Sequence, residues 1–273
     1  MKLLAIIKDS LRYPLSNVKF FMILGVLFLS NVVCFTSFLR LEWLIFIFSV
    51  LGALISVLCV GYFFKVIETS LEDSLVLPSL NSWKVLLYNG VKVFIVMISY
   101  LLPAIIIGLY LTLSFMNELF TLTFGNLSYL SIISIFLRGL LWPGIFNVMG
   151  FLYNASTIAP LGIWALVAIL YILLIMPIIF IAIGNMINAY GDLQEAFNFH
   201  GITTQIFEIG FFKLFTWYIF TSIFYLALLI VDFFIENLIP ITPMHPIYII
   251  WPLIFVPYFY LCLVRSLALL YMS

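Results

Sequence analysis

The sequence predicts an all-α, polytopic transmembrane helix bundle. Of its 273 residues, 66% are hydrophobic and only 8% are charged. A soluble domain carries about 25% charged residues, so these side chains cannot cover a water-facing surface. The apolar runs are continuous and reach about 20 residues or more, the length that a helix needs to cross a bilayer. A β-barrel would instead show segments of alternating polarity about 10 residues long.

The chain starts with an amphipathic segment, residues 2–13, ahead of its first long apolar run. Apolar residues recur there at helical spacing, and charged residues occupy much of the remaining surface. This pattern predicts a short helix in the plane of the lipid headgroups. Pro14 ends it, because proline cannot continue the helix. The apolar positions are Leu3, Leu4, Ile7 and Leu11.

Six longer segments are apolar enough to cross the membrane as helices. Pro103 lies inside the third of them, and Pro177 predicts a kink in the fourth. The predicted spans cover residues 18–38, 43–66, 91–113, 160–189, 211–235 and 247–270.

Two interfacial elbows join spans, and the first follows the second span. It carries acidic residues, then the helix breaker Pro78, then an amphipathic piece that Ser79, Asn81 or Ser82 is able to cap. A tryptophan in this piece suits the membrane interface. The apolar face of the piece consists of Leu80, Trp83, Leu86 and Leu87.

The second elbow follows the fourth span. Asp192 is expected to cap its first turn, and Gly201 is expected to break that turn. Thr203 or Thr204 would then cap a further amphipathic piece. The apolar stripe of the first turn consists of Leu193, Ala196 and Phe197.

The middle of the chain, residues 117–159, is too rich in polar residues, glycine and proline for a convincing span. It forms either a re-entrant segment buried in protein or a two-span hairpin. With six spans and a middle segment that does not cross, nine of the 11 Lys and Arg residues fall on the side of the termini. Basic residues collect on cytoplasmic flanks, so a multi-pass cell-membrane protein with both termini in the cytoplasm is predicted.

The two elbows resemble each other, which suggests an internal repeat within a single membrane domain over residues 1–273. Gly61 matches Gly184, and Glu72 matches Glu195 at the same offset. The repeat units would be residues 43–113 and 160–236, and with six spans they are parallel, as in some transporters. The alternative is that any helix–elbow–helix built from the same few residue types looks similar.

The first elbow and its flanking spans also carry a family resemblance. Residues 61–103 resemble the opening signature of the domain of unknown function 4013 family, uncharacterised, mostly archaeal, multi-pass membrane proteins. The resemblance covers residues 15–235 and implies membership and topology, but no mechanism. Residues 117–159 depart from the expected pattern and are interpreted as an insertion. The matching features are Gly61-Tyr62, Leu77-Pro78, Trp83, Gly90, Lys92, Tyr100 to Pro103, and Glu195-Ala196-Phe197.

Polar residues at the ends of spans are the candidate functional residues. Glu68 and Glu72 share a helical face and form either a cation or basic-partner site, or a solvated helix end balanced by Lys65. Arg138 lies in an apolar run, where an arginine is costly, so it either snorkels to the interface or needs an anionic partner. We hypothesise that this partner is Asp232.

Asn185 and Asn188, at the inner end of the fourth span, form either interhelical hydrogen bonds or a solute site. The full candidate set is Lys65, Glu68, Glu72, Arg138, Asn185, Asn188, Glu195, Asp232 and Glu236.

The sequence contains no HExxH, GxSxG or phosphate-binding glycine loop. We therefore expect a protein that is not an enzyme and that needs no metal or cofactor. The formal net charge of zero gives no reason to expect nucleic acid. The first interpretation is that the bundle, embedded in the lipid bilayer, handles a solute, ion or lipid. The alternative is a partner or assembly subunit, or a homo-oligomer, and a lipid-headgroup enzyme is a third interpretation.

Overall fold

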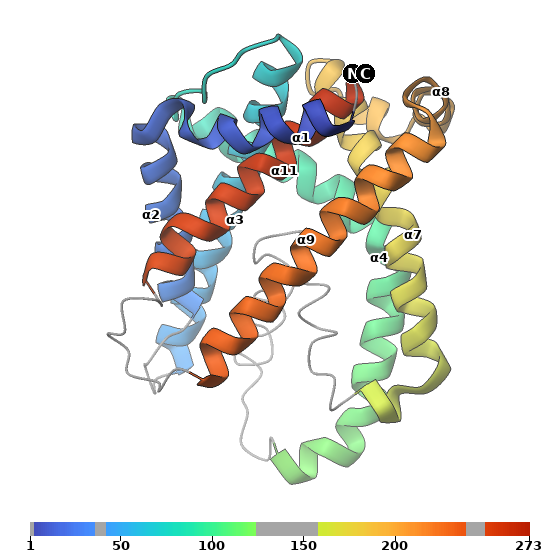
Figure 1. Cartoon of the computed structure of the whole chain (residues 1–273). Helices are drawn as coiled ribbons and strands as arrows, with labels where there is room; N and C mark the ends of the chain where they lie inside the picture. The colour runs from blue at the N-terminus through green and yellow to red at the C-terminus, as the bar shows by residue number, and fades with distance from the viewer. Residues whose placement is uncertain (1–2, 36–41, 124–157, 239–248) are drawn as a thin grey trace.

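The computed structural model describes residues 3–35, 42–123, 158–238 and 249–273 (Figure 1). Within these ranges every regular element is helical, which confirms the all-α prediction. Six helical segments are long and apolar enough to cross a membrane, by length and composition. They are Leu3–Val32, Phe46–Leu71, Trp83–Ile107, Leu166–Asn188, Phe211–Leu228 and Trp251–Tyr271, one for each predicted span.

The N-terminal helix lies crosswise over one end of the bundle. α1 (Leu3–Arg12) is followed by the 3-10 turn η1 (Tyr13–Asn17), which contains Pro14 and leads into α2 (Val18–Phe35). In Figure 1, α1 runs across the ends of the long helices and in contact with α11. The predicted amphipathic helix and its end at proline are confirmed.

The next two helices cross at two glycines. α3 (Glu42–Leu71) and α4 (Trp83–Thr123) approach so closely that a methyl group at Gly61 would overlap the carbonyl oxygen of Leu86. A methyl group at Gly90 would likewise overlap the carbonyl oxygen of Val57. Small residues allow membrane helices to bring their backbones into contact, and here they fix the α3–α4 pair.

The amphipathic piece of the first elbow forms the first turns of α4 and is not a separate element. The carbonyl of Ser82 accepts hydrogen bonds from the backbone N–H groups of Val85 and Leu86. On the predicted apolar face, Leu80 and Leu86 are buried and Trp83 is 47% exposed.

The second elbow differs from the prediction in two respects, at Gly201 and at Thr203 and Thr204. α7 (Ile158–Asn188) leads into η3 (Leu193–Phe197), and Asp192 caps this turn by accepting from the Gln194 N–H at 3.0 Å. Gly201 does not end a helical turn as predicted, because it lies inside α8 (Phe199–Ile209).

The cap of α8 is Asn198, whose side chain accepts from the Gly201 N–H at 3.1 Å. Asparagine is a strong N-cap, so the helix begins before the glycine and the prediction for Gly201 is wrong. The capping role predicted for Thr203 or Thr204 is also wrong, since both hydroxyls donate to the carbonyl of His200 inside the helix.

The last two long helices differ strongly in burial. A π-helical turn, η4 (Trp251–Phe255), opens α11 (Val256–Tyr271). Most residues of the span Trp251–Tyr271 are buried, whereas only 11% of those in Phe211–Leu228, the candidate span within α9 (Phe211–Leu238), are buried. α11 is therefore the central helix, in contact with α1, α2, α3 and α7, and α9 leans across the outside (Figure 1).

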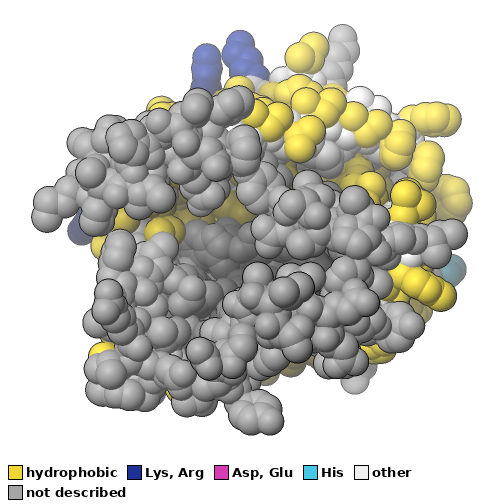
Figure 2. Space-filling model, turned by 90° about the horizontal axis from the view of Figure 1, so that it is seen from below, with side chains coloured by type: hydrophobic (Ala, Val, Ile, Leu, Met, Phe, Trp, Pro, Cys, Tyr) yellow, Lys and Arg dark blue, Asp and Glu magenta, His cyan; other side chains and the backbone are white. Residues whose placement is uncertain are grey.

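Both elbows lie at the same end of the bundle as α1 and the C-terminus (Figure 1). This arrangement agrees with the six-span topology. Figure 2 views the opposite end, where the described side chains in view are mostly hydrophobic. Of the predicted middle segment, residues 117–159, the first residues continue α4 to Thr123 and the last two begin α7. Residues 124–157 lie outside the described residues, so the choice between a re-entrant segment and a hairpin stays a prediction, as does the internal repeat.

Candidate functional site

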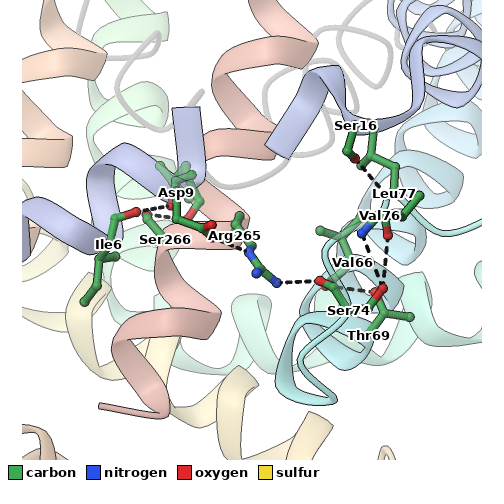
Figure 3. A network of polar contacts seen from close by, with 12 residues as sticks. Ile6, Asp9, Ser16, Val66, Thr69, Ser74, Val76, Leu77, Arg265 and Ser266 are labelled. Atoms are coloured by element: carbon green, nitrogen blue, oxygen red, sulfur yellow. Dashed lines mark hydrogen bonds and ion pairs between the residues drawn. The ribbon is translucent and has the colours of Figure 1, made fainter. Parts of the chain in front are cut away.

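A buried arginine is the centre of a polar layer at the elbow end of the bundle (Figure 3). Arg265 projects from α11 and is 2% exposed. Its Nε donates to Asp9 Oδ2 of α1 at 3.0 Å, and its Nη1 donates to the carbonyl of Ser74 at 2.9 Å. Its guanidinium lies 4.8 Å from the ring centroid of Tyr13. Because a buried charge needs such partners, this one side chain joins α1, η1 and the first elbow to α11.

Other side chains fix the backbone of the first elbow. Tyr62 donates to the carbonyl of Pro78 at 3.0 Å, and Lys65 donates to the carbonyl of Ser79 at 2.8 Å. From η1, the hydroxyl of Ser16 accepts from the Leu77 N–H at 3.1 Å (Figure 3). The elbow is therefore held in place from α3, α11 and η1.

Two hydrogen bonds join the second elbow to α4. Lys92 donates to the carbonyl of Gly191 at 2.5 Å, and Tyr100 donates to the carbonyl of Ala196 at 2.8 Å. The Tyr100 ring also stacks on Phe197 at 5.8 Å. Both elbows are thus tied to the α3–α4 pair and through it to each other.

Removing the Lys92 contact tests this coupling. We expect Lys92→Met to leave the carbonyl of Gly191 without its charged donor and to cost about 1.5–3 kcal/mol. Faster proteolysis at residues 189–198, compared with the unchanged chain in detergent, is the measurement. Lys84→Met is the control, because Lys84 is exposed at the start of α4, and equal cleavage of the two variants would contradict the coupling.

Three of the nine predicted candidate residues make hydrogen bonds that join neighbouring segments. Lys65 binds the first elbow, and Asn185 accepts from the Tyr271 hydroxyl at 2.8 Å, which joins α7 to α11. Glu195 accepts from the Asn198 side chain at 3.0 Å, within its own turn. Each of these described residues bonds within its own elbow or to an adjoining element, so they form several separate contacts.

The other candidates are exposed or lie outside the described residues. Glu68 is half-buried, and Glu72 and Asn188 are exposed. Arg138 lies outside the described residues. Asp232 and Glu236 fall within α9, but their side chains are not described, so the pairing of Arg138 with Asp232 stays a hypothesis. Among the described residues, no group of three His, Cys, Asp or Glu side chains could hold a metal ion.

The sequence analysis missed the pair of Asp9 and Arg265. Arg265 lies in an apolar run, and an arginine at such a position is a candidate by the same argument that singled out Arg138. The sequence did not mark Asp9 as a functional residue, because acidic residues are common on the polar face of an amphipathic helix.

Two apolar cavities lie within the described part of the bundle. One, of about 50 Å³, lies between α3, α4, α7 and α11. The other, of about 90 Å³, lies between α9 on one side and α1 and α11 on the other, and is called the α9 cleft here. Its lining includes Leu11, Trp217, Phe220, Thr221, Phe224 and Phe259.

Aromatic contacts fix the α9 cleft at two levels. At one level Trp217 donates to the Ser266 hydroxyl at 3.0 Å and packs edge-on against Phe180 at 5.8 Å. At the other, Phe224 stacks on Phe259 with ring centroids 5.2 Å apart. α9 is therefore positioned by a few large side chains and leaves apolar space beside them.

These features define a polytopic helical membrane protein whose spans are tied together at one end by a polar layer. Residues 44–236 match the family described as Protein of unknown function (DUF4013), and the chain belongs to that family. The match confirms the resemblance found in the first elbow and its flanking spans. No curated protein and no solved structure matches the chain.

Proposed function

We propose that this protein is not an enzyme and that it handles a membrane lipid, receiving an acyl chain in the α9 cleft. The elbows and termini face the cytoplasm in this proposal. The α9 cleft itself is the observation that carries it. It lies between the least and the most buried of the candidate spans, and its lining is mainly aromatic and aliphatic.

The polarity of the cleft favours a lipid over an ion or a polar solute. Water or an ion in such a space would lose most of its hydrogen bonds, because an apolar cavity offers few partners. The hydroxyls on its lining are already engaged. Ser10 donates to the carbonyl of Ile6, and Thr221 donates to the carbonyl of Trp217.

The position of α9 supports the same proposal. Its long apolar side chains are exposed along much of its length, including Ile223 at 62% and Leu226 at 56%. Such side chains face lipid tails in a membrane. A lipid acyl chain beside α9 can therefore enter the cleft without crossing a polar barrier.

Filling the cleft tests the proposal. We expect Thr221→Phe to reduce the lipid that stays bound after gentle solubilisation, because the added ring occupies the space of the acyl chain. Native mass spectrometry measures the retained lipid per chain. Thr216→Phe is the matched control, because Thr216 is exposed on α9, bonds its own helix in the same way and does not line the cleft. Equal retention in both variants would contradict the proposal.

A second candidate function, a subunit of a membrane complex, is favoured by exposed phenylalanines where α8 meets α9. Phe207 is 81% exposed and Phe212 is 83% exposed, and Phe199, Phe211 and Phe215 are exposed as well. A second polypeptide recovered in fixed ratio, and lost on Phe207→Ser with Phe212→Ser, would support this function. Recovery of the bare chain from its own membrane would argue against it.

A further inference from the structure

The α9 cleft borders a basic strip on α1, and we infer that the lipid it receives carries an anionic headgroup bound by Lys8 and Arg12. This inference rests on the proposed function, because it names the class of lipid that the cleft takes.

α1 presents three different surfaces. Ile6 and Ser10 are buried against the bundle, while Ile7 and Leu11 line the cleft. A third surface faces outward and combines apolar and basic residues at three- and four-residue spacing, which places them along one side of the helix. It consists of Leu4, Lys8, Leu11 and Arg12, and Leu15 of η1 extends it; all five residues are exposed.

Leu11 belongs to both the cleft and the outward surface, which makes it the edge between them. It is 42% exposed, and its carbonyl accepts from the Tyr258 hydroxyl of α11 at 2.6 Å. This contact fixes the end of α1 beside the cleft. Lys8 is one helical turn before Leu11 and Arg12 follows it directly, so both basic residues lie within one turn of Leu11 along α1.

The charges of Lys8 and Arg12 are available to a ligand. Four other cations of the elbow end have a protein partner each: Arg265 with Asp9, Lys65 with Ser79, Lys92 with Gly191 and Lys213 with Ser273. Within the described residues, Lys8 and Arg12 make no such contact. Cations four residues apart on a helix repel each other, and a phosphate between them relieves that repulsion.

The apolar part of the outward surface points to a lipid phosphate instead of a free anion. Leu4 is 81% exposed and Leu15 is 59% exposed, which suits the boundary between headgroups and acyl chains. A phospholipid can therefore place its phosphate on Lys8 and Arg12 and one acyl chain past Leu11 into the cleft.

Competition between two lipids tests the inference. The chain is reconstituted in vesicles that contain equal amounts of phosphatidylglycerol and phosphatidylcholine, and the lipid retained after gentle solubilisation is identified by native mass spectrometry. We expect the anionic lipid to be enriched. Each basic residue near an anionic surface contributes about fivefold in affinity, so K8Q/R12Q should lower the enrichment by about 10- to 30-fold. The control K19Q/K84Q removes two charges from exposed lysines elsewhere at the elbow end of the bundle. This variant should keep most of the enrichment of the anionic lipid.

The outcomes separate this inference from the proposed function. Lipid retention that falls with Thr221→Phe but shows no preference between the two lipids would overturn the headgroup inference. It would still agree with the α9 cleft as the lipid-binding site. Enrichment that survives in K8Q/R12Q would overturn it too. Lipid retention that Thr221→Phe does not change would overturn the proposed function as well. Inorganic phosphate that stays bound to the chain while the two lipids are retained equally would show that the basic pair binds free phosphate, against the inference.

Discussion

Replacing Gly61 by valine should prevent α3 and α4 from packing and lower the free energy of unfolding by about 3 kcal/mol. Even the Cβ of an alanine at this position would overlap the carbonyl oxygen of Leu86. A flexible side chain could rotate away from such an overlap, but a backbone oxygen inside a helix cannot. α3 and α4 would have to separate. The hydrogen bonds that join both elbows to these two helices would then be strained. The measurement is the midpoint of thermal unfolding in detergent.

The control for this prediction is Gly201→Ala. Gly201 also lies inside a helix, but a methyl group there would meet only the ends of two side chains, Asn198 at 3.3 Å and Asn185 at 3.5 Å. Alanine is the better helix former, so this variant should be neutral or slightly stabilising. Gly90→Ala should be destabilising like Gly61→Val, because it would overlap the Val57 carbonyl on the same crossing. Unchanged unfolding of Gly61→Val would mean that the helices do not approach as described.

Asp9→Asn and Arg265→Met should each lower the free energy of unfolding by about 2–3 kcal/mol. The loss in Asp9→Asn comes from a guanidinium that stays 2% exposed without its counter-charge. In Arg265→Met, the carboxylate of Asp9 loses its partner but remains 37% exposed and can be hydrated. The carbonyl of Ser74 also loses its donor, so the first elbow should loosen.

The double variant Asp9→Asn with Arg265→Met measures the interaction between the two side chains. Once the arginine is gone, the change at Asp9 no longer leaves a buried charge unpaired, so the two losses should not add. We expect a coupling of at least about 1 kcal/mol in a double-mutant cycle. Lys84→Met should change stability by less than about 0.5 kcal/mol, as exposed sites usually do. Strictly additive losses would show that Asp9 and Arg265 act independently.

Hydropathy predicted the spans well, because length and apolarity alone decide which segments fit a bilayer. Pro14 and Asp192 were also predictable, since both act on their own local backbone. Gly201 was not, because the stronger local signal was the cap at Asn198, three residues earlier. The family resemblance in residues 61–103 includes Gly61 and Gly90, which pack at the crossing of α3 and α4. It also includes Lys92 and Tyr100, which donate hydrogen bonds to the second elbow.

The polar layer could not be predicted, because its bonds join residues that are far apart in the chain. Asp9 and Arg265 are 256 positions apart, and Lys92 and Gly191 are 99 apart. No spacing rule connects such residues, and although Arg265 stands out in its apolar run, nothing local identifies Asp9 as its partner. The α9 cleft was hidden for a similar reason, since its walls are apolar residues of three helices that hydropathy assigns equally to core or lipid.

An experimental structure of the chain in a lipid nanodisc would test the lipid proposal most directly. The account predicts acyl-chain density between α9 and α11, passing Leu11 and bordered by Trp217, Phe224 and Phe259. The matching phosphate density should lie at Lys8 and Arg12. A cleft closed by direct packing of α9 on α11, with no room for a chain, would contradict lipid handling at this site.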